Sequence, residues 1–282
     1  MSGLTSQLTF GPRLYRAVQE KGPLCVGIDP HPSLLREWGL TDDPPGLERF
    51  SLTVVEALAD RVAVLKPQSA FFERHGSAGV AILERVITGI RSVEGLVLTD
   101  VKRGDIGSTV QAYADAYLDL SSPLCSDAVT ASPYLGFESL RPLLDTASRH
   151  HNGVFVLALT SNPEGGQIQR ARTGSGLTVA GTVLASVRAE NEGMTPWGNV
   201  GVVVGATIDA DDEDLDVNGP VLTPGYGAQG GKAADLRLIF GPALRNVLPA
   251  SSRAVLSQGP NQRRLQAAAA RALDAFVTVL PA

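Results

Sequence analysis

The amino-acid sequence predicts an α/β fold, a (β/α)8 TIM barrel that occupies residues 1–282 as a single domain. Its length of 282 residues falls within the size range of α/β barrels. Short apolar runs alternate with helical segments along the chain, which is the order that a parallel sheet covered by helices requires. No change in composition marks a linker between two domains.

Eight short runs rich in Val, Leu and Ile predict the strands. They lack strict in/out alternation, which suits parallel strands that are buried on both faces. An open doubly wound sheet would show the same alternation of strands and helices, but eight units favour a closed barrel. The predicted strands are Leu24–Asp29, Val62–Gln68, Leu96–Lys102, Asp127–Ser132, Val154–Thr160, Val200–Thr207, Val221–Gly227 and Ser252–Leu256.

Helical spacing of apolar residues is clearest in six segments that lie between these runs or follow the last one. They place a helix after most of the strands, as a barrel requires. The predicted helices are Leu47–Asp60, Ser77–Val93, Ser108–Asp119, Phe137–His150, Leu177–Asn191 and Gln262–Val279.

Composition restricts the class of protein. The chain is 44% hydrophobic and 19% charged, enough apolar material for a large core. A net charge of −5 argues against a nucleic-acid partner, whose phosphates would need neutralising by Lys and Arg. Cys25 and Cys125 lie too far apart for paired metal-ligand spacing, and no signal peptide or membrane span is evident. We therefore expect a cytoplasmic protein without a membrane partner.

Two polar segments allow more than one interpretation. Ser161–Gly176 is longer than most loops and follows a predicted strand, so it could be a lid over a ligand or an incidental surface loop. Asp209–Asp216 is strongly acidic but lacks the glycine that a calcium-binding loop has at its sixth position. We interpret it as a solvated acidic stretch.

Charged side chains collect where the first three predicted strands end, the side on which barrels keep their active sites. Asp29 ends the first run, Lys66 lies in the second, and Asp100, Lys102 and Asp105 follow one another at the end of the third. In an extended strand Asp100 and Lys102 point to the same face. A structural salt bridge would explain that pair alone, but the alternating array of acids and bases favours a catalytic site.

The segment DVKRGDIGST (Asp100–Thr109) resembles the D-x-K-x-x-D signature of the orotidine 5′-phosphate decarboxylase family. Related barrels that act on sugar phosphates share this signature, so the specificity of the match comes from further segments, in the order of the longer bacterial branch of the family. They are LCVGIDP (Leu24–Pro30), VLKPQSAFFERHG (Val64–Gly76), ASPYLG (Ala131–Gly136), LTSNPEG (Leu159–Gly165) and TPGYGAQGG (Thr223–Gly231).

The resemblance implies decarboxylation of orotidine 5′-monophosphate (OMP) to uridine 5′-monophosphate (UMP) and CO₂, the last step of de novo pyrimidine synthesis, with no cofactor and no metal. It implies that Lys102 is the proton donor, flanked by Asp100 and Asp105. Asp105 and Thr109 would reach this site from the second subunit of a homodimer.

The resemblance also implies the residues that bind the nucleotide. Asp29 and Lys66 match positions that hold ribose hydroxyls, and Lys66 also extends the catalytic charge array. Ser161 matches the serine that binds the pyrimidine edge. Gln229 and Arg253 match the phosphate-binding positions, assisted by backbone N–H groups.

Two other functions remain as alternatives. A metal-dependent sugar-phosphate aldolase or decarboxylase barrel would share the D-x-K-x-x-D motif but would need a shell of metal ligands. A non-catalytic phosphate-binding barrel would not need the Asp100, Lys102 and Asp105 array. A dinucleotide-binding function is disfavoured, because GYGAQG (Gly225–Gly230) lies near the C-terminus and not in a first βαβ unit.

Overall fold

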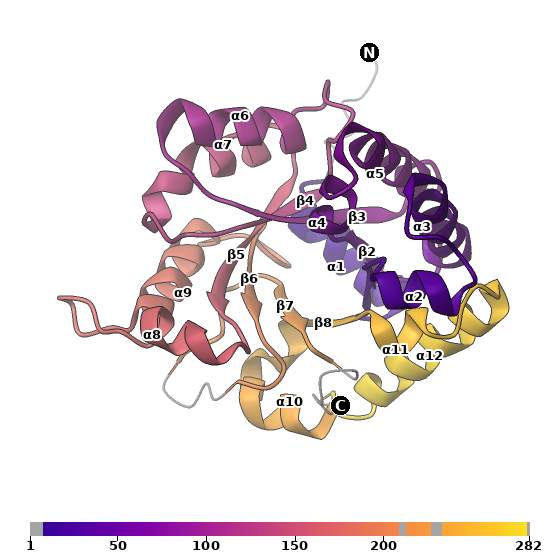
Figure 1. Ribbon diagram of the computed structural model, residues 1–282. Helices are drawn as coiled ribbons and strands as arrows, with labels where there is room; N and C mark the ends of the chain where they lie inside the picture. The colour runs from indigo at the N-terminus through magenta and orange to yellow at the C-terminus, as the bar shows by residue number, and fades with distance from the viewer. Residues whose placement is uncertain (1–7, 209–212, 227–232, 281–282) are drawn as a thin grey trace, which may run out of the picture.

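The computed structural model describes residues 8–208, 213–226 and 233–280, and its eight parallel strands form a closed barrel (Figure 1). Each strand pairs with its neighbour in chain order, and the last pairs with the first. The barrel, rather than an open sheet, is therefore confirmed. The strands are β1 (Cys25–Ile28), β2 (Val64–Pro67), β3 (Leu96–Arg103), β4 (Ala128–Ala131), β5 (Gly153–Leu159), β6 (Val200–Val204), β7 (Val221–Pro224) and β8 (Val247–Ser251).

Helices surround the barrel (Figure 1). All six predicted helical segments are helical, although the fourth begins with a 3₁₀ turn, η1. The described α-helices are α1 (Phe10–Lys21), α2 (Pro32–Glu37), α3 (Pro44–Leu58), α4 (Ser69–Glu73), α5 (Gly76–Arg91), α6 (Gly107–Leu118), α7 (Arg141–Arg149), α8 (Gly166–Gln169), α9 (Val179–Glu190), α10 (Ala233–Phe240), α11 (Arg253–Leu256) and α12 (Gln262–Val277). The 3₁₀ helices are η1 (Phe137–Leu140), η2 (Pro163–Gly165) and η3 (Gly241–Asn246).

Side-chain caps fix the starts of three long helices. Asp43 accepts a hydrogen bond from the third residue of α3, and Thr178 and Asn261 do the same for α9 and α12. Each cap satisfies one of the backbone N–H groups that a helix leaves unpaired at its N-terminus. The helices therefore begin where the local sequence offers an oxygen acceptor.

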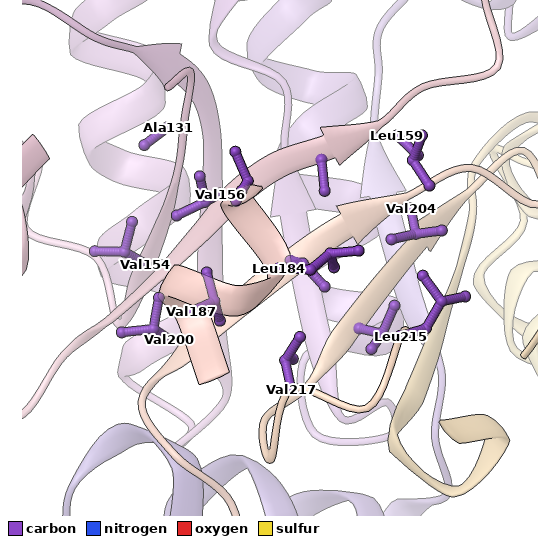
Figure 2. Close-up of a cluster of buried hydrophobic side chains, with 14 of the residues drawn as sticks. Ala131, Val154, Val156, Leu159, Leu184, Val187, Val200, Val204, Leu215 and Val217 are labelled. Atoms are coloured by element: carbon purple, nitrogen blue, oxygen red, sulfur yellow. The ribbon is translucent and has the colours of Figure 1, made fainter. Parts of the chain in front are cut away.

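Apolar packing between strands and helices forms much of the core. Figure 2 shows valines of β5 and β6 together with Leu184 and Val187 of α9, within one cluster of buried side chains. Burying a valine or leucine contributes about 1.5–3 kcal/mol relative to leaving it exposed. This layer holds the strands in place, and so it holds the polar side chains that follow them.

The N-terminal end of the barrel is closed by α1, a helix that the sequence reasoning missed. Phe10 packs edge-on against Phe155 of β5, with ring centroids 5.9 Å apart. The backbone N–H of Gly11 donates to Asn199 Oδ1 over 2.8 Å. The carboxyl ends of the strands lie at the opposite end of the barrel from α1.

The prediction of the eighth strand was wrong. Ser252–Leu256 was predicted as a strand, but β8 is Val247–Ser251 and Arg253–Leu256 forms the short helix α11. The true strand contains Pro249 and the small residues Ala250 and Ser251, so it lacks a strong apolar run. The apolar pair Val255 and Leu256 is buried on one face of α11 instead.

The two polar segments have defined contacts where they are described. Ser161–Gly176 contains the short helices η2 and α8. Of Asp209–Asp216, residues 209–212 lie outside the described part of the chain. The remainder is anchored, because Asp214 pairs with Arg188 and Asp216 pairs with Arg245. Over the described ranges, no helix combines the length and apolarity needed to cross a membrane.

Candidate active site

Asp100 lies at the centre of a charged cluster at the carboxyl ends of β2, β3 and β4. Its Oδ2 accepts from Lys66 Nζ at 3.0 Å, and its Oδ1 accepts from Lys102 Nζ at 2.6 Å. Thr130 of β4 donates a third hydrogen bond to Oδ1, at 2.8 Å. Asp100 and Lys66 are almost fully buried, with 7% and 6% of their surfaces exposed. One carboxylate thus holds two ammonium groups.

The cluster keeps its charges because the partners outweigh the cost of burial. Burial alone would raise the pKa of Asp100, but the positive charges of Lys66 and Lys102 hold it well below its ordinary value. Burial alone would lower the pKa of Lys66, but the charges of Asp100 and Asp29 raise it above its ordinary value. Opposite charges at this distance favour the ionised form of each group.

Lys102 has an unusual backbone conformation. Its φ angle is +46°, a region that residues other than glycine seldom adopt. It lies where the register of β3 against β4 shifts between Thr99 and Arg103. Its side chain is 44% exposed, in contrast to the buried Lys66. The bulge therefore presents one lysine of the cluster to a ligand, and strained backbone of this kind is typical of functional sites.

A cavity of about 230 Å³ lies beside the cluster, at the ends of β1, β7 and β8. Asp29, Lys66 and Arg253 contribute charged groups to its wall. The buried atoms Asp29 Oδ1, Ser251 Oγ and Ser252 Oγ have no hydrogen-bond partner among the described residues. Buried polar atoms are normally paired, so this cavity is suited to a ligand that carries hydroxyl or anionic groups.

A second cavity, of about 190 Å³, adjoins the first, and Pro224 lines both. Asp100, Lys102 and Thr130 line it, together with Ser161, which follows the end of β5. The remaining wall is mostly apolar and includes Leu157, Leu159, Val203 and Leu222. An apolar wall with a few polar groups is typical of a site that binds a flat organic ring.

A larger cavity, of about 850 Å³, lies at the opposite end of the barrel, near the start of β3. Its charges are mixed, and its most buried pair, Arg13 and Asp127, is already joined by a short ion pair. Asp127 also accepts from the N–H of Val97. Size alone therefore does not identify the site, and the smaller cavities beside Lys102 have the reactive groups.

A family model described as Orotidine 5′-phosphate decarboxylase / HUMPS family matches residues 22–268. The chain belongs to this family. It is 64% identical over 266 residues to an orotidine 5′-phosphate decarboxylase of Salinispora arenicola, with 94% of this chain and 96% of the relative covered. Identity to an orotidine 5′-phosphate decarboxylase of Streptomyces coelicolor is 60% over 263 residues, with 93% and 95% covered.

Solved structures show the same fold for members of the orotidine 5′-phosphate decarboxylase family. A crystal structure from Streptomyces avermitilis, provisionally named an orotidine 5′-phosphate decarboxylase, superposes with a TM-score of 0.96 at 57% identity and covers 99% of this chain and 98% of its own. An OMP decarboxylase from Leishmania donovani gives a TM-score of 0.72 at 27% identity, with 96% and 99% covered.

The structure brings together most residues that match the family pattern. Lys66, Asp100 and Lys102 form the cluster. Asp29 and Arg253 line the first cavity, and Ser161 lines the second. Arg253 is the first residue of α11, directly after β8, so it lies at the end of the eighth strand even though that strand was misplaced in the prediction.

Two residues of the predicted site, Asp105 and Thr109, are not joined to it within the described chain. Asp105 accepts from the N–H of its neighbour Ile106, and within the described chain it has no ion pair with Lys102 at 4.0 Å or less. Thr109 is exposed in the first turn of α6. Gln229 lies outside the described residues. That a second subunit delivers Asp105 and Thr109 stays a prediction.

Thr130 is a residue of the site that the sequence reasoning missed. It lies in the middle of a predicted strand, and its partner Asp100 belongs to the neighbouring strand. One signal was available, because a hydroxyl inside a strand buried on both faces has to find a hydrogen-bond partner. The partner's identity depends on strand register, which the sequence does not state.

Proposed function

We propose that this chain decarboxylates OMP to UMP and CO₂ without a cofactor, in the final step of de novo pyrimidine synthesis. The observation that carries this proposal is the cluster of the buried Lys66 and Asp100 with the exposed Lys102, which lines the two adjoining cavities. The named relatives, similar over nearly the whole chain, support the same reaction.

The reaction requires charge stabilisation at one ring carbon. When the bond between C6 and the carboxylate breaks, CO₂ leaves and the electron pair stays on C6, in the plane of the ring, where no π-system can delocalise it. The ammonium of Lys102 stabilises this pair and then donates a proton to C6, which gives UMP. The neutral Lys102 regains its proton from water. A preorganised charge in a site of low dielectric is effective at this task.

Asp100 and Lys66 prepare Lys102 for this role. Asp100 Oδ1 accepts a hydrogen bond from the Lys102 ammonium at 2.6 Å and so holds it in place. Lys66 neutralises the other oxygen of the same carboxylate. Asp105, from the second subunit, would add a further negative charge near the ammonium.

The rest of the nucleotide would occupy the first cavity. Asp29 and Lys66 bind the ribose hydroxyls, and Arg253 binds the phosphate together with Gln229. Arginine suits this position because its planar guanidinium offers paired donors to phosphate oxygens. Ser161 binds the pyrimidine edge from the second cavity. Binding free energy from the phosphate can be used to close the loops and expel water.

A homodimer with shared active sites completes the proposal, in the cytoplasm. Ile106, Tyr134 and Leu135 are large apolar residues that are 62%, 74% and 53% exposed. Ile106 follows β3, in the same loop as Asp105, and Tyr134 and Leu135 follow the neighbouring strand β4. Their exposure supports a partner surface there. A second copy of the chain bound at this surface could deliver Asp105 and Thr109 to Lys102.

The alternative function, a metal-dependent aldolase or decarboxylase barrel, requires a metal site. It needs a shell of acidic or His ligands, and over the described ranges no three His, Cys, Asp or Glu side chains gather in a group that could hold a metal ion. The non-catalytic alternative does not explain why two buried charges and a strained lysine are maintained beside an open cavity.

An absorbance assay tests this function. The purified chain is mixed with OMP, and loss of the orotate absorbance is followed with and without a strong chelator. We expect turnover that the chelator does not change. Turnover that depends on added Mg²⁺ or Zn²⁺ would favour the metal-dependent barrel, and no turnover by the folded protein would favour the non-catalytic one.

A further inference from the structure

The hydroxyl of Thr130 joins β4 to the catalytic end of β3. Thr130 is 1% exposed. Its Oγ1 donates to Asp100 Oδ1 at 2.8 Å and accepts from the backbone N–H groups of Val101 and Lys102 at 3.0 and 2.9 Å. A hydroxyl has one donor and two acceptor sites, so its hydrogen-bonding capacity is fully used.

These hydrogen bonds replace part of the strand ladder. Thr99 pairs with Val129, and the next recorded pair is Arg103 with Ala131. Between these two pairs the chain advances by four residues in β3 but by only two in β4, so β3 contains a bulge. Extra residues of a bulge lose their regular ladder partners, and the hydroxyl of Thr130 accepts from two of the N–H groups in this stretch.

The hydroxyl also holds both ends of Lys102. Through the N–H of Lys102 it holds the residue's left-handed backbone. Through Asp100 Oδ1 it orients the carboxylate oxygen that accepts from Lys102 Nζ. The position of the Lys102 ammonium therefore depends on the Thr130 hydroxyl in two ways. The hydroxyl binds the backbone of Lys102 directly, and it orients the Asp100 carboxylate that accepts from Lys102 Nζ.

We infer that Thr130 is a positioning residue of the decarboxylase, which fixes the Lys102 ammonium by holding the bulge in β3 and the Asp100 carboxylate together. The inference rests on the proposed function. Thr130 itself transfers no proton. Its effect falls on the transition state, because misplacing a catalytic group by a small distance lowers the rate more than it lowers substrate binding.

The isosteric variant Thr130→Val tests this inference, with Thr130→Ser as the conservative variant. Thr130→Val keeps the shape but removes all three hydrogen bonds, and we expect kcat to fall about tenfold to a hundredfold while KM for OMP changes less than about threefold. Thr130→Ser keeps the hydroxyl, and we expect its kcat within about threefold of the wild type.

Thr99→Val is the matched control. Thr99 is also buried in β3, next to Asp100, and its hydroxyl bonds Ser126 Oγ at 2.6 Å rather than a site residue. We expect this variant to lose stability in denaturant but to keep its kcat. Equal loss of kcat in both Val variants, in parallel with their loss of stability, would overturn the positioning role, as would wild-type kcat in Thr130→Val.

Ligand affinity gives a readout that is independent of turnover. We expect Thr130→Val to bind UMP as the wild type does, but to bind an analogue with an anionic pyrimidine ring more weakly. If Thr130→Val does not fold, Thr130→Ala carries the same expectations. A wild-type chain that does not turn over OMP would refute the proposed function, and the inference with it. An active wild type with unchanged Thr130 variants would refute the inference alone.

Discussion

At the scale of single residues, the site depends on a buried carboxylate that is shared by two lysines. Burying the charges of Asp100 and Lys66 is costly unless they are paired, and removing one partner leaves the other uncompensated. The two lysines differ in exposure, because Lys66 is buried and Lys102 is exposed. Lys66 stabilises the cluster, whereas Lys102 is available to the substrate.

Replacing Lys102 by alanine should abolish turnover without unfolding the protein. Asp100 keeps Lys66 and Thr130 as partners, so its charge stays compensated. We expect kcat to fall by more than about a thousandfold, with UMP still bound. Steady-state kinetics and a UMP titration measure the two effects. Lys21→Ala, at the other end of the barrel, is the matched control, and near-normal kcat in Lys102→Ala would refute the assignment.

Replacing Arg253 by alanine should weaken only ligands that carry a phosphate. Loss of charge-assisted hydrogen bonds costs about 2 kcal/mol, roughly a thirtyfold rise in the Kd of UMP. Uridine should bind the variant and the wild type equally. Calorimetric titration with both ligands checks this, with the exposed Arg263→Ala as the control. Equal losses for UMP and uridine would contradict a phosphate-binding role.

The positions of single site residues could be predicted from the sequence where those residues lie at the ends of strands. Asp29, Lys66, Asp100 and Lys102 were placed at or near the carboxyl ends of strands, and the structure puts them there. Arg253 fell inside the misplaced eighth strand of the prediction, but it directly follows β8 in the structure. The hydrogen bonds of Thr130 could not be found in this way, because they depend on a shift in register between β3 and β4. The sequence shows which polar side chains each strand carries. The pairing register between neighbouring strands decides which of those side chains form hydrogen bonds with one another.

At the scale of secondary structure, the end of β3 is the element on which the site depends. After the bulge the chain passes very close to β4, where Ser132 N donates to Arg103 O at 2.8 Å. A side chain at Gly104 would place its Cβ 2.3 Å from Ser132 O. Only glycine allows this approach, so the DVKRGD segment needs its glycine as well as its charges.

The variant Gly104→Ala should therefore destabilise the protein. Overpacking against backbone costs about 1–3 kcal/mol in the free energy of unfolding, and the bulge should move with it, so kcat should fall too. Denaturant unfolding and kinetics measure both. Gly174→Ala is the control, because nothing lies within 4 Å of a Cβ at that position. Equal stability of the two variants would show that the turn tolerates a side chain.

Long, periodic elements were predicted more reliably than short ones. The predicted segments for α3, α5, α6, α9 and α12 all coincide with helices. Helices of only four to six residues, such as α2, α4 and α11, were missed because so short a segment shows no full period. The eighth strand was misplaced because Pro249 and the small residues around it do not form an apolar run.

At the scale of the whole molecule, the barrel gathers charges from distant parts of the sequence. Asp29 and Arg253 meet at one cavity because β8 pairs with β1. In one chain Asp105 is half-buried and its neighbour Ile106 is exposed. The proposed dimer would use that face.

Mixing two inactive variants tests the shared site. Lys102→Ala and Asp105→Ala are combined under conditions in which subunits exchange. Each mixed dimer then has one site with both lesions and one intact site, so activity should recover to about a quarter of the wild-type value. Native mass spectrometry confirms the exchange. Exchange without any recovered activity would reject the shared site and leave the decarboxylase function standing.

Product analysis in D₂O tests the central claim most directly. The purified chain is incubated with OMP in D₂O, and the products are followed by proton NMR and CO₂ measurement. Because Lys102 then carries deuterium, the account predicts UMP with deuterium at C6 and one CO₂ for each UMP, with folded Lys102→Ala giving neither. OMP left unchanged by the folded wild-type protein would contradict it.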